Sequence, residues 1–260
     1  MKTIRLLATV ATLLTASVLI GLLTSCASNP SVNSATSANG GSPTASLYAN
    51  AAPLDLRLSA WPYPYPTKEF KTSLQGVPAS MIYMDVAAQG KQKGVVLLFH
   101  GKNFSSDYWA PTIAGLTQAG YRVIAPDQIG FGKSSKPNVQ YHFDDLALNT
   151  KALLKSLGIQ RVSVIANSMG GMVGVRFARL YPQTVQKLVL ENPLGLEDYS
   201  KDIPPQQNDN LLKLEMAQTE TSYRRFLQSY FPTWQPAYEK FVERSEEHTS
   251  ELQSHHDLVC

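Results

Sequence analysis

Hydrophobic and polar residues follow two different periods along the chain. Short continuous apolar runs occupy residues 95–99, 121–125, 162–166 and 185–190. Between these runs, apolar residues recur at helical spacing over 108–119, 143–157 and 169–180. A strand that is apolar throughout is buried on both faces, and strands separated by helices pair in parallel. The pattern therefore predicts an α/β fold with a mostly parallel sheet and flanking helices.

Two strands of a different kind precede this region. Residues 70–74 and 80–86 alternate between apolar and polar positions, which is typical of antiparallel strands, and Gly76-Val-Pro78 supplies a turn between them. Upstream, Trp61-Pro-Tyr-Pro-Tyr-Pro66 predicts an extended strap, because the residue before each proline is kept out of the helical region. We therefore expect the folded body to begin near residue 61.

The N-terminus has the layout of an export signal. Lys2 and Arg5 precede an uncharged run over 6–23, and Leu23-Thr-Ser-Cys26 follows it. This tetrapeptide resembles the bacterial lipobox. The resemblance implies that 1–25 are a lipoprotein signal peptide, that Cys26 is the lipidation site, and that the exported protein is anchored to a membrane through its lipid. In a Gram-negative host it implies the outer membrane or periplasmic side. A plain membrane anchor is the alternative, since the run approaches spanning length.

The segment after the signal has the composition of a linker. Residues 27–52 consist mainly of Ser, Ala, Asn, Thr, Gly and Pro and contain no charged residue. Such a segment cannot bury a hydrophobic core. We interpret 26–60 as a flexible tether.

The C-terminal 244–260 segment differs from the rest of the chain. It lacks apolar periodicity, and Arg244 to Ser254 match the in-frame translation of a common sequencing-library adapter. We interpret 244–260 as adapter read-through rather than native sequence, with a natural charged tail as the alternative. On this interpretation the chain is truncated.

Composition narrows the classes of partner. The net charge is +3, and no cluster of Lys and Arg with interleaved aromatic residues occurs, which argues against a nucleic-acid partner. The two cysteines, Cys26 and Cys260, both lie outside the predicted body, so it has no disulfide framework and no cysteine zinc site. Gly130-Phe-Gly-Lys-Ser134 lacks the glycine spacing of nucleotide-binding loops. We expect no cofactor and no metal.

Candidate chemical groups follow the ends of three predicted strands. Asn167-Ser-Met-Gly-Gly171 lies directly between a strand and a helix, where a nucleophile would sit on a sharp turn. The usual pattern is Gly-x-Ser-x-Gly, and Ala166 departs from it by one methyl group, for which the neighbouring strand must leave room. His100-Gly-Lys-Asn-Phe104 and the segment from Asp127 to Pro137 follow the other two strands.

Together these three segments resemble the α/β-hydrolase superfamily in order and spacing over residues 80–196. The resemblance implies that 61–196 form the N-terminal part of a hydrolase core, with Ser168 as the nucleophile. It also implies that the backbone N–H groups of Met169 and Lys102 form the oxyanion hole, which stabilises the charge that acyl transfer builds on the carbonyl oxygen. His100 and Asp127 are then expected to organise loops rather than to catalyse.

A serine nucleophile needs a base and a carboxylate that orients the base. In the superfamily both follow the serine, first the acid and then the histidine. The histidines after Ser168 are His248, His255 and His256, all in the adapter-like segment. Glu191, at the end of a predicted strand, is an alternative acid, and a surface or pocket-wall role competes with that interpretation. We expect the last strands, with the catalytic acid and histidine, to be missing from this chain.

Residues 197–243 are polar and helical in pattern, with scattered aromatic residues. The resemblance implies a helical lid or cap over an apolar pocket, and ordinary helix packing is the alternative.

The predicted function is a serine hydrolase that cleaves an ester or related acyl bond of a small, apolar substrate through an acyl-enzyme. Ser168 argues against dehalogenase and epoxide hydrolase chemistry, for which similar enzymes use Asp. A carbon–carbon bond hydrolase, which Asn167 to Gly171 also resemble, is one alternative. A non-catalytic binding protein of the same fold, or an inactive truncated fragment, is the other.

Overall fold

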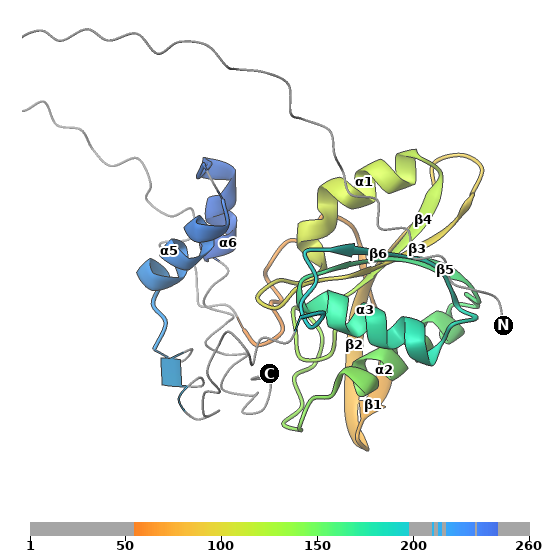
Figure 1. Cartoon of the computed structure of the whole chain (residues 1–260), viewed down its shortest axis with the longest axis horizontal. Helices are drawn as coiled ribbons and strands as arrows, with labels where there is room; N and C mark the ends of the chain where they lie inside the picture. Colours follow the sequence, from red (N-terminus) through yellow and green to blue (C-terminus); the bar gives the residue numbers. More distant parts are fainter. Residues whose placement is uncertain (1–54, 198–209, 211–212, 215–216, 232, 244–260) are drawn as a thin grey trace, which may run out of the picture. The chain divides into compact units, whose positions relative to one another are not determined.

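A six-stranded sheet forms the centre of the computed structural model, which describes residues 55–197, 210, 213–214, 217–231 and 233–243 (Figure 1). Strands β1 (Thr67–Leu74) and β2 (Val77–Val86) pair antiparallel, and β2 also pairs antiparallel with β4. The parallel part consists of β3 (Gly94–Phe99), β4 (Tyr121–Pro126), β5 (Val162–Asn167) and β6 (Val185–Glu191). The strand order is β1-β2-β4-β3-β5-β6. The predicted α/β class with a mostly parallel sheet is confirmed.

The turn between β1 and β2 is shorter than the sequence pattern predicts. Leu74 pairs with Val77, so only Gln75 and Gly76 form the turn, and both have positive φ, 51° and 82°. Two positive φ values match the right-handed twist of the flanking strands. Pro78, which we expected in the turn, lies in β2 opposite Ser73.

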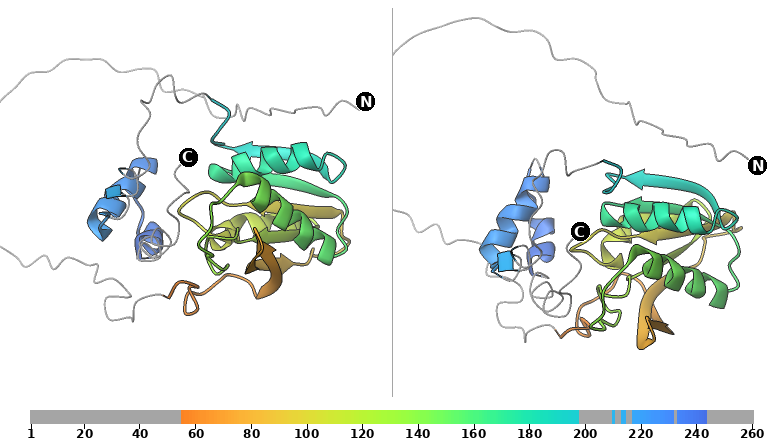
Figure 2. Two further views of the ribbon diagram at one scale, coloured as in Figure 1. Left: turned by 90° about the horizontal axis from the view of Figure 1, so that it is seen from below. Right: turned by 60° about the horizontal axis from the view of Figure 1, so that its bottom comes forward.

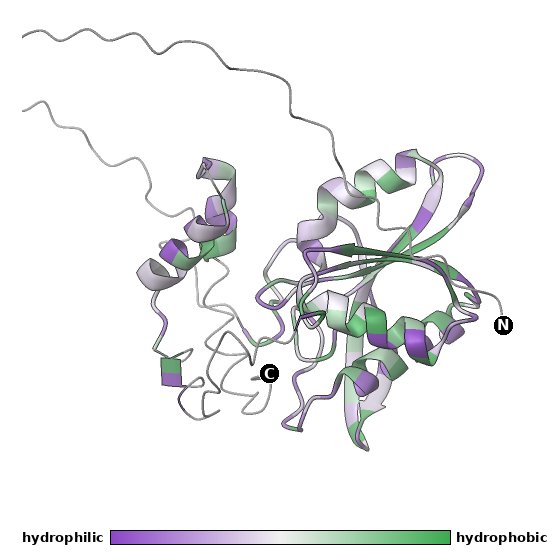
Figure 3. Cartoon of the chain, in the orientation of Figure 1, coloured by the Kyte–Doolittle hydropathy of each residue, from purple (hydrophilic) through white to green (hydrophobic). Residues whose placement is uncertain are grey.

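Helices cover both faces of the sheet, as Figures 1 and 2 show. The 3-10 turn η1 (Ser106–Trp109) and helix α1 (Ala110–Gln118) lie on one face, and α2 (Phe143–Ser156) and α3 (Met169–Leu180) lie on the other. Val96 and Leu98 of β3 pack with Ile113 of α1. Leu97 and Phe99 belong to the second core, formed with α2 and α3. The central strands are hydrophobic along most of their length (Figure 3), because both of their faces are buried.

The C-terminal described region is helical and has a small core of its own. Helix α5 (Glu220–Tyr230) begins with a capping box between Thr219 and Ser222, and η3 (Pro236–Tyr238) and α6 (Glu239–Glu243) follow. Buried Tyr223, Leu227 and Val242 form its centre. Phe104, two residues after Lys102, packs against this cluster.

Several predicted segments lie outside the described residues: the signal peptide 1–25, Cys26, the tether up to residue 54, and 244–260. The last six residues of the predicted tether are described, and they lie against the body, since Leu58 is fully buried. Contacts with the body therefore reach residues before the predicted start at 61, at least as far as Leu58. In the described part of the chain, no helix is long and apolar enough to cross a membrane.

Candidate active site

Ser168 occupies a strained backbone position between β5 and α3. Its φ of 52° and ψ of −123° lie in a region that residues with a side chain rarely adopt. Three hydrogen bonds fix this turn. The N–H of Ser168 donates to the carbonyl of Glu191 at 3.1 Å, and its own carbonyl accepts from the N–H groups of Gly171 at 2.8 Å and Leu194 at 3.0 Å. The backbone thus holds the Ser168 side chain at the carboxyl end of the central strands.

Glycine residues allow the segments around Ser168 to approach one another closely. A Cβ on Gly170 would collide with the backbone carbonyls of Phe99 and His100, the latter at 2.5 Å. A Cβ on Gly101 would lie 3.1 Å from Ser168 Cβ and 3.6 Å from Ser168 Oγ. The loop after β3 therefore touches the serine side chain, and Lys102 follows the point of contact directly.

Ala166 replaces the first glycine of the usual nucleophile pattern, and the structure shows what makes room for it. Ala166 is fully buried in β5. A Cβ on Gly174 would lie only 2.9 Å from the Ala166 methyl group. The room is provided by Gly174 of α3, and not by a neighbouring strand as we expected.

His100 and Asp127 both organise loops, as predicted. His100 is fully buried; its Nε2 accepts from the N–H of Gln128 at 2.9 Å, and its Nδ1 lies 2.9 Å from the carbonyl of Gly101. Because Nε2 is an acceptor, the proton of the neutral ring lies on Nδ1. Fully buried Asp127 accepts from the Ser106 N–H at 2.7 Å, the Ser106 hydroxyl at 2.6 Å and the Lys133 N–H at 2.8 Å.

The strap over residues 61–66 contributes to this region, which the sequence did not predict. The Tyr63 hydroxyl lies 2.6 Å from Asp127 Oδ2 and 3.0 Å from Ser105 Oγ. Burial, together with the negative charges of Asp127 and Asp107, raises the pKa of Tyr63 well above its usual value. The proline pattern predicted the extended strap but carried no signal for these contacts.

Asn167 is a second residue near the nucleophile that the sequence did not single out. Its Nδ2 donates to the carbonyl of Glu191 at 3.2 Å, and the Tyr108 hydroxyl lies 3.4 Å from its Oδ1. The side chain before Ser168 therefore links the end of β6 to η1. Its variable place in the usual pattern gave no indication of this role.

The other candidate groups for this site are Met169, Glu191 and the histidines. Met169 is the first residue of α3 and is nearly buried, so its N–H belongs to the positive end of that helix. The Glu191 backbone contacts Ser168, while the Glu191 side chain is exposed. Among the described residues, no group accepts a hydrogen bond from Ser168 Oγ, and the histidines there are His100 and His142. His248, His255 and His256 lie outside the described residues.

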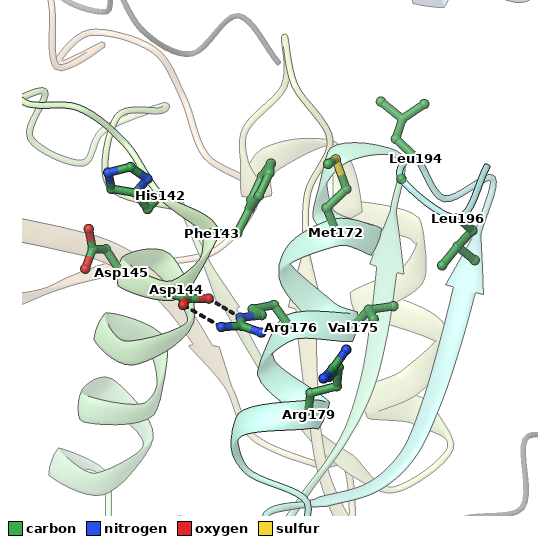
Figure 4. A pocket seen from close by; sticks show the side chains of 11 residues that line it. His142, Phe143, Asp144, Asp145, Met172, Val175, Arg176, Arg179, Leu194 and Leu196 are labelled. Atoms are coloured by element: carbon green, nitrogen blue, oxygen red, sulfur yellow. Dashed lines mark hydrogen bonds and ion pairs between the residues drawn. The ribbon is translucent and has the colours of Figure 1, made fainter. Parts of the chain in front are cut away.

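A groove of about 590 Å³ lies on the side of the body that α2 and α3 cover (Figure 4). Its walls are the start of α2, the exposed side of α3 and residues 194–196. Arg176 forms an ion pair with Asp144, and hydrogen bonds from Arg176 lower the pKa of Asp144. Ser168, Met169 and Lys102 do not line this groove. This groove is therefore distinct from the candidate active site.

The described His, Cys, Asp and Glu residues form no group of three that could hold a metal ion. The chemistry that the described arrangement offers is nucleophilic, from Ser168, with backbone N–H groups nearby.

Several known proteins are similar to this chain in sequence or in structure. A solved structure of a probable hydrolytic enzyme from Pseudomonas aeruginosa PAO1 is 41% identical, with a TM-score of 0.71, and the match covers 76% of this chain and 68% of that one. A 2-hydroxy-6-oxononadienedioate/2-hydroxy-6-oxononatrienedioate hydrolase from Paraburkholderia phymatum is 35% identical over 48% of this chain and 44% of the relative. A haloalkane dehalogenase from Mesorhizobium japonicum is 33% identical over 48% of this chain and 39% of the relative.

The chain thus spans less than half the length of these two curated relatives. The model of the family described as alpha/beta hydrolase fold matches residues 94–257, which include β3 to β6 and the serine turn. The chain belongs to the α/β-hydrolase fold family.

Proposed function

We propose that this protein is a serine hydrolase that cleaves an ester or related acyl bond of a small, apolar substrate. Ser168 Oγ attacks the acyl carbon and passes its proton through a base to the alcohol that leaves, and water later hydrolyses the acyl-enzyme, which releases the acid and restores the Ser168 hydroxyl. The N–H groups of Met169 and Lys102 stabilise the oxyanion in both steps. The observation that carries the proposal is the positive φ of Ser168 at a strand-to-helix turn, with the Gly101 loop against its side chain. Strain of this kind is held at functional sites.

The residue type at position 168 supports acyl transfer within the family. The resemblance associates Asp at this position with dehalogenase and epoxide hydrolase chemistry, and this chain has Ser. A serine alkoxide forms an ester with an acyl group, which water can hydrolyse after activation by a base.

The test measures covalent labelling and turnover in the same protein. A fluorophosphonate probe should label the complete protein on Ser168, and the complete protein should hydrolyse p-nitrophenyl acyl esters. Ser168→Ala should abolish labelling and lower turnover by about 10³-fold or more. Ser163→Ala is the matched control, because Ser163 lies in β5, the strand that leads into Ser168, five residues earlier. Labelling that persists in Ser168→Ala, or is equally lost in Ser163→Ala, would contradict the proposal.

We also propose that the native protein continues beyond Glu243 with a catalytic acid and histidine, and that 244–260 derive from an adapter. Sequencing the genomic locus past the codon for Glu243 tests this directly. A reading frame that continues into an Asp and then a His supports the complete hydrolase. A genomic sequence that encodes Arg244 to Cys260 and then stops would overturn the adapter interpretation and favour a non-catalytic protein of this fold. If the continued frame has a His but no Asp or Glu before it, Glu191 is the acid to test, by Glu191→Gln.

A carbon–carbon bond hydrolase is the second candidate. It is supported by the 35% identity to the Paraburkholderia phymatum enzyme over 128 residues. The two candidates are distinguished by assaying 2-hydroxy-6-oxononadienedioate beside the acyl esters. A higher kcat/KM for the dienedioate would replace the esterase proposal.

Anchoring to a membrane is a separate proposal that rests on Leu23-Thr-Ser-Cys26. Cells that express the full chain should incorporate labelled palmitate into it, and Cys26→Ser should abolish the label. Incorporation that survives this substitution would overturn Cys26 as the lipidation site.

A further inference from the structure

The strap over residues 61–66 alternates between two kinds of side chain. Its three aromatic residues face the body: Trp61 is 6% exposed, and Tyr63 and Tyr65 are half-buried. Its three prolines are exposed. Proline has no backbone N–H to satisfy, and its fixed φ keeps the strap extended. The aromatic side chains are therefore presented to the body by a segment that has little conformational freedom of its own.

Two of these aromatic residues donate hydrogen bonds to carboxylates that flank the loop after β3. Trp61 Nε1 donates to Asp107 Oδ2 at 3.1 Å, and the Tyr63 hydroxyl lies 2.6 Å from Asp127 Oδ2. Ser105 lies between Asp107 and Tyr63. Its Oγ is 2.7 Å from Asp107 Oδ1 and 3.0 Å from Tyr63 Oη. Tyr63 and Ser105 each have one hydroxyl proton. Since the contacts to the carboxylates are the shorter ones, Tyr63 donates to Asp127 and Ser105 donates to Asp107.

Asp127 connects the Tyr63 hydroxyl to the backbone of the loop after β3. Its Oδ2 accepts from Tyr63 and from the Lys133 N–H, and its Oδ1 accepts from the Ser106 N–H and hydroxyl. A Cβ on Gly132 would lie 2.6 Å from Asp127 Cγ, so the surrounding backbone closes around the carboxylate. A fully buried carboxylate with four donors has a fixed position, and it fixes the residues that donate to it.

We propose that Tyr63 is a positioning residue for the oxyanion hole. Through Asp127 it holds Ser106, and thereby the short loop in which Lys102 lies four residues earlier. Lys102 follows Gly101, which contacts Ser168, so the orientation of the Lys102 N–H depends on how firmly both ends of this loop are held. The inference rests on the proposed function for its catalytic consequence, but the clamp itself is independent of that function.

The expected consequence is specific to the chemical step. An oxyanion-hole donor acts on charge that develops during the reaction, so a mobile donor lowers kcat and leaves KM nearly unchanged. Loss of one such donor lowers kcat by about 10²–10³-fold. We expect Tyr63→Phe, which loosens the donor without removing it, to lower kcat by roughly tenfold.

The experiment compares Tyr63→Phe with Tyr65→Phe in the full chain. Tyr65 lies in the same strap, and among the described residues its hydroxyl makes no hydrogen bond, so removing it controls for a general change in the strap. Hydrogen exchange of the backbone amides over 102–106 is the first measurement. Tyr63→Phe should speed exchange there by about tenfold or more, and Tyr65→Phe should not. Unchanged exchange in Tyr63→Phe, or an equal increase in both variants, would overturn the proposal.

Kinetics with p-nitrophenyl esters in the complete protein are the second measurement. A lower kcat with KM within about twofold in Tyr63→Phe supports the proposal. Faster exchange without any change in kcat would overturn the positioning role. If Ser168→Ala shows that the protein has no esterase activity, the proposed function fails, while the exchange result still decides whether Tyr63 holds the loop. Trp61→Phe is a second variant, which removes the bond to Asp107 and should speed exchange at the same amides to a smaller degree.

Discussion

The two loops that meet at Ser168 are held by different means. The turn from Asn167 to Gly171 is held by the backbone: a positive φ, close approach at glycine, and main-chain hydrogen bonds to the end of β6. The loop from Gly101 to Asp107 is held by side chains, chiefly Asp127 and the aromatic residues of the strap. Both sets of restraints join segments that are distant in the sequence, but the first consists of main-chain atoms, whereas the second consists of side chains that a single substitution can remove. One half of the site is therefore held by main-chain geometry, and the other depends on particular side chains.

The largest effect that this comparison predicts is on the backbone-held side. Gly170→Ala should lower the free energy of unfolding by about 3 kcal/mol or more, because the new Cβ would collide with the carbonyls of Phe99 and His100. These are backbone atoms at the end of central strand β3 and of the residue directly after it, and they cannot move aside. Urea unfolding followed by circular dichroism measures the change.

Gly115→Ala provides the control for that prediction. Gly115 lies in α1, and a Cβ there meets no atom within 4 Å. Alanine in a helix is favoured over glycine, so this variant should be as stable as wild type or more stable by up to about 1 kcal/mol. Equal losses in the two variants would contradict the idea that Gly170 is needed for close approach.

An intermediate effect is expected where Ala166 and Gly174 share one space. Gly174→Ala alone should cost about 1–2 kcal/mol, since its Cβ would lie 2.9 Å from the Ala166 methyl group. In the Ala166→Gly background the same substitution should cost about 1 kcal/mol less, because the contact is removed. A double-mutant cycle by urea unfolding measures this coupling. Additivity within about 0.3 kcal/mol would show that the two positions do not compete for space.

The smallest effect concerns an ion pair away from both loops, between β2 and β4. Burial raises the pKa of Asp85, but hydrogen bonds and charges from Arg122 and Lys68 outweigh burial and hold it below its usual value. A carboxylate with a lowered pKa in the folded state contributes stability above its unfolded pKa and loses it as the pH falls through the folded value. Stability should therefore decrease below about pH 4.

Melting temperatures measured from pH 7 down to pH 2 test this sign. Asp85→Asn should be less stable than wild type at pH 7, and the difference should shrink as the pH falls below about 4. A difference that stays constant across this range would show that Asp85 contributes by packing rather than by charge.

The contrast between the loops also explains what the sequence could predict. The helix and strand periods gave the order of the elements from β3 to β6, because burial on one or both faces imposes those periods on each element separately. The serine turn was found for the same reason, since its glycines and its serine are adjacent in the chain. The Tyr63 contact to Asp127 joins residues 64 positions apart, and no local pattern records such a pair. The Gln75–Gly76 turn was misplaced because a proline two residues later gave the stronger signal.

The hydrogen bonds of Ser168 to Glu191 and Leu194 also limit where this fold accepts a change in length. They close a short ring that contains the last residue of β6 and the two residues after it, Asn192 and Pro193. An insertion or deletion inside this ring would pull the serine away from its turn, because neither hydrogen bond could follow. Segments of different length, or a whole cap grafted from another protein, should therefore be joined only after Leu194.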